Sequence, residues 1–154
     1  MNPLKNILVP TDFSEMAQSA LTYAKVLAEA FGAALHLVHV AQDPITCVPI
    51  MEPNMSTAAV LAQVRDELGR DARQRLSTAL GEAEQKKFRS KWELRWGVPY
   101  IEIDEYATGH DIDLIVMGTH GRGAIGGLFL GSVADKLVRK APCPVLVVRP
   151  PARA

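Results

Sequence analysis

The sequence predicts a doubly wound α/β domain with a five-stranded parallel sheet of order 3-2-1-4-5 and helices on both faces. Apolar runs of strand length alternate along the chain with amphipathic segments of helix length, which is typical of a parallel sheet. Most of the strand runs are apolar at consecutive positions, as expected for strands covered on both faces. No linker, repeat or low-complexity segment interrupts residues 1–154, so we expect a single domain.

The first strand and helix are predicted from the residues that precede Gly32. Ile7–Val9 is a short apolar run that stops at Pro10, which indicates a buried strand. The turn that follows ends at Ser14, a residue type that favours the N-cap of a helix. From there small and apolar residues recur at helical spacing as far as Phe31, and Gly32 ends the helix.

The next part of the chain predicts a second strand, a loop and a long helix. Residues 34–40 are mostly apolar and form the strand. Residues 41–56 hold three prolines and indicate an irregular loop. Residues 57–87 keep an apolar stripe among Ala, Leu, Glu, Gln and Arg, which predicts one long helix with bends near Gly69 and Gly81.

The remaining elements follow in the same alternation. Residues 91–96 read KWELRW, and their strict alternation predicts an edge strand with one wet face. A helix from Pro99 to about Thr108 comes next, with the proline in its first turn. Asp113–Met117 is the fourth strand, and residues 133–140 form the last helix before the fifth strand.

A glycine-rich loop separates the fourth strand from the last helix, which opens at Ser132. The glycines of this loop make up more than half of the chain's 11 glycines; they are Gly118, Gly121, Gly123, Gly126, Gly127 and Gly131. Glycine lets backbone N–H groups come close to a ligand, and a helix start adds unpaired N–H donors and the positive end of the helix dipole. The loop therefore predicts an anion site, most simply for phosphate, with a plain connecting loop as the alternative.

Three glycine motifs can be read in this loop. Gly126–Ser132 has the spacing of a P-loop but lacks the lysine that contacts the terminal phosphates. Gly121–Gly126 spells the dinucleotide fingerprint, but it follows a late strand and no acidic residue lies about twenty positions on. The third motif, G-x2-G-x9-G-S over Gly118–Ser132, accounts for the whole loop.

This third motif resembles the ATP-binding branch of the universal stress protein family. The flanking sequences DLIVMGTHGR and APCPVLVV, together with the N-terminal ILVPTDFS, are similar to that family too. The resemblance covers the whole chain. It implies a Rossmann-like domain that binds an adenine nucleotide and has a stress-linked role in the cytoplasm.

The predicted strand order also places the site. The winding direction reverses between the first and fourth strands, and sheets of this kind bind ligands beyond the carboxyl ends of the strands at that point. The segment after the first strand and the glycine loop should therefore share one crevice. The candidate nucleotide-binding residues are Pro10, Thr11, Asp12, Val40, Met117, Gly118, Gly121, Arg122, Gly131, Ser132 and Val133.

These candidates take different roles. The loop and helix-start residues would surround the phosphates through backbone N–H groups, the Ser132 hydroxyl and the Arg122 guanidinium. Asp12 could accept hydrogen bonds from the ribose or the adenine amino group, although a turn or helix-cap role explains it equally well. The resemblance favours the nucleotide, because the family's binding aspartate occupies this Pro-Thr-Asp position. Val40 and Met117 would flank the base.

The histidines give no metal site. His120 in the loop either reaches a phosphate or is an exposed loop residue. His36 and His39 lie three apart on a strand and so point to opposite faces. No His, Cys and carboxylate cluster has metal-ligand spacing, so we expect Mg²⁺ or Mn²⁺ only as an ion carried by the phosphates.

Composition excludes several classes of function. Lys plus Arg and Asp plus Glu number 17 each, so no net charge favours nucleic acid or an anionic membrane. No apolar run approaches the roughly 20 residues that span a bilayer, and MNPLKN leads straight into the first predicted strand, so we expect no signal peptide here. Cys47 and Cys143 lie far apart in unlike contexts, so we expect no disulfide framework and a cytoplasmic protein.

The fifth strand, Pro144–Val148, would form a sheet edge although it is nearly all apolar. An exposed edge of this kind tends to aggregate, and pairing with a second copy of the chain covers it. We therefore expect a homodimer through this strand, which is also common in the family that the chain resembles.

Three functions stay open. The first is a regulatory protein that binds ATP, AMP or cyclic AMP and hydrolyses ATP slowly or not at all. The second is an ATP hydrolase or nucleotidyl transferase; hydrolysis needs a base and a charge-neutralising group, and the loop offers His120 and Arg122 but no P-loop lysine or metal-holding acid. The third is a dimerisation module that binds no nucleotide. The intact glycine motif argues against this third function.

Overall fold

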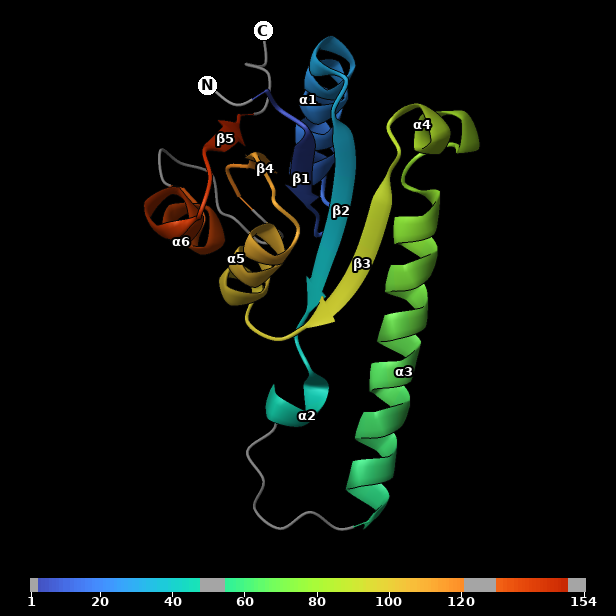
Figure 1. The fold of residues 1–154 in the computed structure, drawn as a ribbon. Coiled ribbons are helices and arrows are strands. Elements are labelled where there is room, and N and C mark those ends of the chain that lie inside the picture. Colours follow the sequence, from blue (N-terminus) through green and yellow to red (C-terminus); the bar gives the residue numbers. More distant parts are fainter. Residues whose placement is uncertain (1–2, 48–54, 121–129, 150–154) are drawn as a thin grey trace, which may run out of the picture.

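The structure, a computed structural model, describes residues 3–47, 55–120 and 130–149 and contains a five-stranded sheet (Figure 1). The strands are β1 (Asn6–Pro10), β2 (Ala34–Ala41), β3 (Lys91–Trp96), β4 (Leu114–Gly118) and β5 (Val145–Val148). All neighbours pair in parallel in the order β3-β2-β1-β4-β5, which confirms the predicted topology.

The helices cover both faces of the sheet, as predicted. They are α1 (Glu15–Phe31), α2 (Pro44–Cys47), α3 (Met55–Thr78), α4 (Glu82–Lys87), α5 (Pro99–Gly109) and α6 (Ser132–Lys140). The helices α1 and α3 pack on one face, around a core that includes Ile7, Val9 and Leu35. The helices α5 and α6 pack on the other face, around Leu8, Val38 and Ile115 (Figure 1).

The ends of α1 follow from single residues, as the sequence predicts. The Ser14 side chain accepts a hydrogen bond from the Ala17 N–H at 3.2 Å, which caps the first turn. Gly32 adopts the left-handed conformation with φ 66° and donates its N–H to the Ala28 carbonyl oxygen. The turn before α1 and the first turn of α1 are therefore fixed by local chemistry.

The prediction of one helix over residues 57–87 is wrong, because α3 and α4 are separate. The chain continues as helix through Gly69 and breaks before Gly81, which stands at the N-cap of α4. The Gln85 side-chain amide donates to the carbonyl oxygens of Ser77 and Leu80, at 3.0 and 2.8 Å. These bonds satisfy the Ser77 carbonyl in the last turn of α3 and the Leu80 carbonyl just after this helix.

The predicted irregular loop over residues 41–56 contains the short helix α2. Asp43 precedes Pro44, and its carboxylate accepts from the Ile45 N–H at 3.0 Å. Proline in the first helical position and a capping aspartate before it are common at helix starts. The Asp-Pro pair was therefore the signal for this helix.

The edge position of β3 agrees with the prediction. Its polar face, however, is partly covered by a helix and is not fully exposed to solvent. The Arg65 guanidinium lies over the Trp96 ring at 4.6 Å, on the side of α3. On the other side the Arg95 guanidinium donates to the Glu102 carbonyl oxygen of α5 at 3.1 Å. Helices thus cover part of both faces of this strand.

None of the helices in the described ranges combines the length and the hydrophobicity that crossing a bilayer requires.

Candidate functional site

A cleft of about 680 Å³ lies beyond the carboxyl ends of β1 and β4, and β2, α5 and α6 supply its other walls. Its volume is in the range of small-molecule sites. The cleft lies where the winding direction of the sheet reverses, as expected from the strand order. The lining residues are Pro10, Thr11, Asp12, Ala17, Val38, Val40, Gln42, Pro99, Ile103, Met117, Gly118, Thr119, His120, Gly131, Ser132, Val133 and Ala134.

The structure brings most of the predicted site residues to this one cleft. Those that line it are Pro10, Thr11, Asp12, Val40, Met117, Gly118, Gly131, Ser132 and Val133. Gly121 and Arg122 lie outside the described residues. The segments that meet here are about a hundred residues apart in the chain, and the parallel pairing of β1 with β4 joins them.

The base of the glycine loop is closed by backbone hydrogen bonds. The Gly131 N–H donates to the Thr119 carbonyl oxygen at 2.7 Å, and the Thr119 N–H donates to the Val148 carbonyl oxygen at 3.1 Å. The first bond ties the start of α6 to the end of β4, and the second ties that point to β5. The position of α6 relative to the cleft is therefore fixed by the described residues on either side of the loop.

The turn between β1 and α1 forms the opposite wall. The Thr11 N–H donates to the Val38 carbonyl oxygen at 2.8 Å, and His39 donates from Nδ1 to the Thr11 carbonyl oxygen at 2.8 Å. The Asp12 carboxylate accepts from the Ser14 N–H at 3.0 Å. Asp12 therefore has the turn role that its sequence position allows, and it lines the cleft at the same time.

The N-terminus of α6 points donors at the cleft. Gly131 is the N-cap and has no side chain to bond the first turn. Its own N–H is taken by Thr119, so the first-turn donors are the N–H groups of Ser132, Val133 and Ala134, which all line the cleft. Donors of this kind at the positive end of a helix dipole favour an anion.

Apolar side chains also line the cleft. They include Val40 and Met117, together with Val38 and Ile103. The sequence alone did not identify Ile103, nor Gln42 and Pro99, as site residues. Gln42 directly follows β2, and this position at a strand end could have identified it as a site residue. Pro99 and Ile103 belong to α5, whose placement over the cleft depends on tertiary packing and could not be read from the sequence.

The ionisable groups among the described lining residues are Asp12 and His120. His120 is half-buried, and its Nδ1 lies 3.0 Å from the Thr119 hydroxyl. In the described part of the chain no three His, Cys, Asp or Glu residues form a group that could hold a metal ion. The cleft thus offers an acceptor, helix-start donors and apolar walls, which together suit an amphipathic anion.

Comparison with known proteins identifies the family. A sequence model of the universal stress protein family matches residues 3–149. The chain belongs to this family. A universal stress protein of Thermus aquaticus is 39% identical over 145 residues, which cover 94% of this chain and 98% of the relative.

Solved structures of universal stress proteins share the fold. The protein UspA from Lactobacillus plantarum superposes with a TM-score of 0.76 at 32% identity, covering 97% of this chain and all of the other. A universal stress protein in complex with cAMP has a TM-score of 0.59 at 21% identity over 96% of this chain and 98% of that one. The Archaeoglobus fulgidus protein in complex with dAMP has a TM-score of 0.61 at 22% identity, with 95% and 98% covered.

Proposed function

We propose that this universal stress protein is a regulator of the ATP-binding branch that holds an adenine nucleotide in the cleft and hydrolyses ATP slowly or not at all. The observation that carries the proposal is the meeting of Asp12, the N-terminus of α6 and an apolar wall around one cavity. The occurrence of cAMP and dAMP in structures of the same fold supports the choice of nucleotide.

The three parts of a nucleotide match the three parts of the cleft. The adenine ring would lie between Val40 and Met117, and the ribose hydroxyls would donate to the Asp12 carboxylate. The phosphates would accept from the N–H groups of Ser132 and Val133 and from the Ser132 hydroxyl. A nucleotide combines an apolar ring with charged phosphates, and the cleft is lined by both apolar side chains and helix-start N–H groups.

The rest of the phosphate site belongs to the glycine loop. We assign Gly121 and Arg122 to it on the G-x2-G-x9-G-S motif alone, because both residues lie outside the described ranges. A guanidinium at this point would offset phosphate charge. Mg²⁺ or Mn²⁺ would be held by the phosphates and water, as is usual for these ions on nucleotides.

Slow hydrolysis follows from what the cleft offers. Phosphoryl transfer needs a group that orients the attacking water and cations that neutralise charge on the transferring phosphoryl. Among the described lining residues, the groups that could act as a base are Asp12, which already accepts from the Ser14 N–H at 3.0 Å, and His120, whose Nδ1 lies 3.0 Å from the Thr119 hydroxyl. This arrangement favours holding ATP over cleaving it.

We also propose a stress-response role, which membership of the family supports, and a cytoplasmic location. Both cysteines are free thiols, with Cys47 exposed and Cys143 half-buried. Free thiols of this kind are the usual state of cysteine in a reducing compartment.

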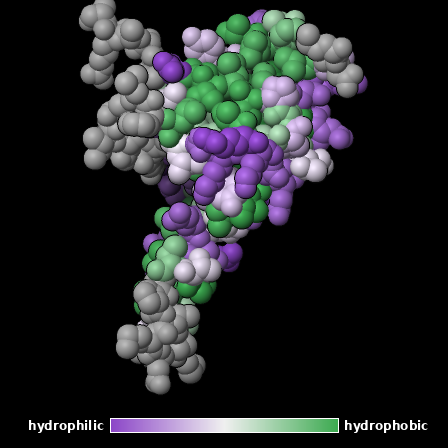
Figure 2. Space-filling view, turned by 90° about the vertical axis from the view of Figure 1, so that its left-hand side faces the viewer, coloured by the Kyte–Doolittle hydropathy of each residue, from purple (hydrophilic) through white to green (hydrophobic). Residues whose placement is uncertain are grey.

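We further propose that two copies form a homodimer through β5. This strand is the edge of the sheet next to β4, and Leu146 on it is 38% exposed. Figure 2 shows hydrophobic side chains gathered on the side of the molecule that carries β5 and α6. On α6, Val138 is 50% exposed. A second copy covers both the unpaired strand edge and this apolar surface.

Calorimetric titration of ATP, AMP and cyclic AMP, with and without Mg²⁺, tests the nucleotide proposal. The expected result is saturable binding with one nucleotide per chain and little ADP afterwards. Rapid ADP release would replace the regulator with an ATP hydrolase. Absence of binding by all three nucleotides would leave the dimerisation module as the function.

Two variants locate the nucleotide. Asp12→Ala should weaken binding of AMP and ATP about tenfold or more, because it removes a charged hydrogen-bond acceptor. Asp43→Ala is the matched control: Asp43 also accepts from an N–H two residues on, but it does not line the cleft. Equal effects of the two variants would contradict the role of Asp12.

Gly131→Val tests the phosphate end separately. The backbone of Gly131, with φ −60° and ψ 158°, is one that valine adopts readily. The added side chain at the start of α6 should hinder the phosphates and leave adenosine, which has none, nearly unaffected. Unchanged ATP affinity in the folded variant would overturn the assignment of the phosphates to this helix start.

A further inference from the structure

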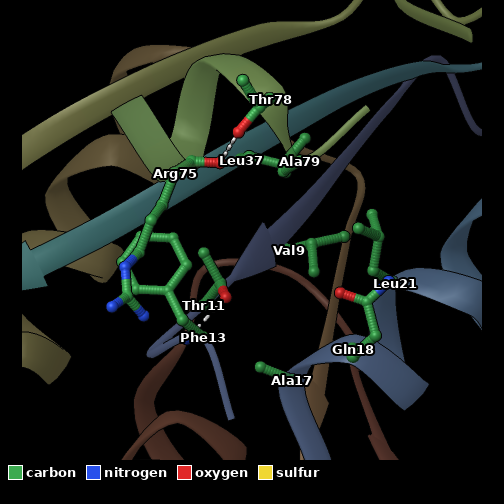
Figure 3. Close-up of a pocket in the computed structure, with 10 residues that line it drawn as sticks. All are labelled: Val9, Thr11, Phe13, Ala17, Gln18, Leu21, Leu37, Arg75, Thr78 and Ala79. Carbon is green, nitrogen blue, oxygen red and sulfur yellow. Dashed lines mark hydrogen bonds between the residues drawn. The ribbon is translucent and has the colours of Figure 1, made fainter. Parts of the chain in front are cut away.

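A second pocket, of about 380 Å³, lies on the other face of the sheet from the cleft. It opens between the first turns of α1 and the last turns of α3, at the carboxyl end of β1 and beside the middle of β2 (Figure 3). Val9 and Leu37 form its floor and belong to the core under α1 and α3. We name it the far-side pocket. Thr11 lines both it and the cleft, and so does Ala17.

The far-side pocket has an apolar interior and a polar mouth. Phe13 and Ala79 are half-buried, and their side chains form apolar walls above the floor made by Val9 and Leu37. Three exposed polar side chains stand around the opening, Gln18 from α1 and Arg75 and Thr78 from α3 (Figure 3). Sites for small molecules commonly combine an apolar body with a few polar groups that orient the ligand.

The Arg75 guanidinium is held at this mouth by two contacts. It lies over the Phe13 ring at 5.5 Å from the centroid, and its Nε pairs with the Asp71 carboxylate at 3.0 Å. Both partners of the ion pair are exposed, at 48% and 61%, so the pair is weak and can be exchanged for another anion. A planar guanidinium positioned on an aromatic ring is suited to bind a carboxylate with two hydrogen bonds.

Phe13 is held in an unusual conformation that makes it a wall of the pocket. Its φ is 64°, in the left-handed region that bulky residues rarely adopt. The Phe13 N–H donates to the Thr11 hydroxyl at 3.0 Å, and the ring packs on His39 with centroids 4.6 Å apart. Strained residues of this kind gather at ligand sites, and here the strain places an aromatic ring under a cation.

We propose that the far-side pocket is a second ligand site, which binds a small monocarboxylate with an aromatic or short apolar body. The carboxylate binds the Arg75 guanidinium, and the apolar body lies against Phe13 and Ala79. The amide of Gln18 donates a hydrogen bond to the rim of the ligand, and Thr78, whose hydroxyl donates to the Gln74 carbonyl oxygen at 2.9 Å, borders it. This site goes beyond the nucleotide proposal and does not depend on it.

An amide NMR titration of the full chain, without nucleotide, tests this site with phenylacetate as the probe. We expect saturable shifts at Phe13, Gln18, Thr78 and Ala79, with a dissociation constant in the millimolar range. Phenylacetamide, which has the same shape without the charge, should bind at least several-fold more weakly. Equal affinity of the two probes, shifts confined to the cleft, or no saturable shift would each overturn the proposal.

Variants at the mouth make the test specific. Arg75→Gln should weaken phenylacetate binding about tenfold, because it removes a charge-assisted hydrogen bond. Arg73→Gln is the matched control: it removes the same charge from α3 at a position near Gly69 and Trp96, outside the pocket. Gln18→Trp, at an exposed position, should close the mouth and abolish the shifts. Unchanged binding in Arg75→Gln or in Gln18→Trp contradicts the site.

Discussion

Gly118 ends β4 at the cleft, and the packing of α1 against it explains why this position needs glycine. A Cβ added there would lie 2.9 Å from the Met16 Cβ and 3.1 Å from the Met16 backbone carbon and oxygen. Backbone atoms of a helix cannot move aside as a flexible side chain can. The first glycine of the motif therefore serves helix–strand packing, whatever the ligand.

We predict that Gly118→Ala destabilises the fold by about 1–3 kcal/mol, the usual cost of overpacking. The free energy of unfolding in urea measures it. Gly109→Ala is the control, because nothing lies within 4 Å of a Cβ at Gly109, the last residue of α5. That variant should be neutral or slightly more stable, since alanine favours helix. Equal stability of both variants would contradict the packing role.

His36 is a buried member of a polar cluster between β2 and α5. It is 2% exposed, and its Nδ1 lies 2.9 Å from the Tyr106 hydroxyl, whose ring stacks on His110 with centroids 3.8 Å apart. Burial, with the nearby charges of Lys91 and His110, lowers the pKa of His36 from 6.5 to about 4. Burial also raises the pKa of Tyr106 to about 12.

This shift predicts a loss of stability in acid. The unfolded chain takes up the His36 proton near pH 6.5 and the folded chain only near pH 4, so stability falls as the pH drops between these values. The full effect of the pKa difference is roughly 3 kcal/mol. Urea unfolding of the wild type and of His36→Gln at pH 7 and pH 4.5 measures it. The variant should lose less stability over this interval; parallel losses would contradict the assignment.

At the scale of elements, the boundaries set by local chemistry were predictable and those set by packing were not. Ser14 and Gly32 bound α1 as their residue types indicate. The break between α3 and α4 escaped prediction because the apolar stripe continues across it, through the buried Leu80. Gly81 was read as a bend, but the capping of α4 by Glu84, which accepts from the Gly81 N–H at 3.3 Å, makes it a helix start.

The start of α1 lines both the cleft and the far-side pocket, and its cap can be tested directly. Ser14→Ala removes the acceptor of the Ala17 N–H and should destabilise the fold by about 1 kcal/mol. Ser14→Asp keeps an acceptor at the same place and should restore most of the stability. Thermal or urea unfolding measures both. Ser19→Ala, in the interior of α1, is the control and should cost little.

At the scale of the whole molecule, the topology alone predicted where the cleft opens. Pro10 and Gly118 end neighbouring strands, and the reversal of winding between them opens the cleft that the sequence predicted. The contribution of Ile103 was not predictable, because helical periodicity identifies a core residue without saying which part of the sheet it covers. The far-side pocket depends on the positive φ of Phe13. This conformation could not be predicted, because no residue type in that turn indicates it.

The free edge of β5 carries the last prediction. Two copies related by a two-fold axis can pair this strand with itself and bury Leu146, which the single chain leaves 38% exposed. Leu146→Lys places a charge on the edge, the device by which natural proteins prevent strands from pairing. Sedimentation velocity should show the wild type as a dimer and Leu146→Lys shifted to the monomer at the same concentration.

The control for this test is a variant with lysine at an exposed apolar position far from β5. Val60→Lys on α3 alters a side chain that is 59% exposed and lies on the other side of the sheet from α6. It should sediment as the wild type does. Because Leu146 is exposed in the single chain, its lysine variant should keep the fold, and an unchanged circular dichroism spectrum checks this. A folded Leu146→Lys variant that remains dimeric would show that the two copies meet at another surface.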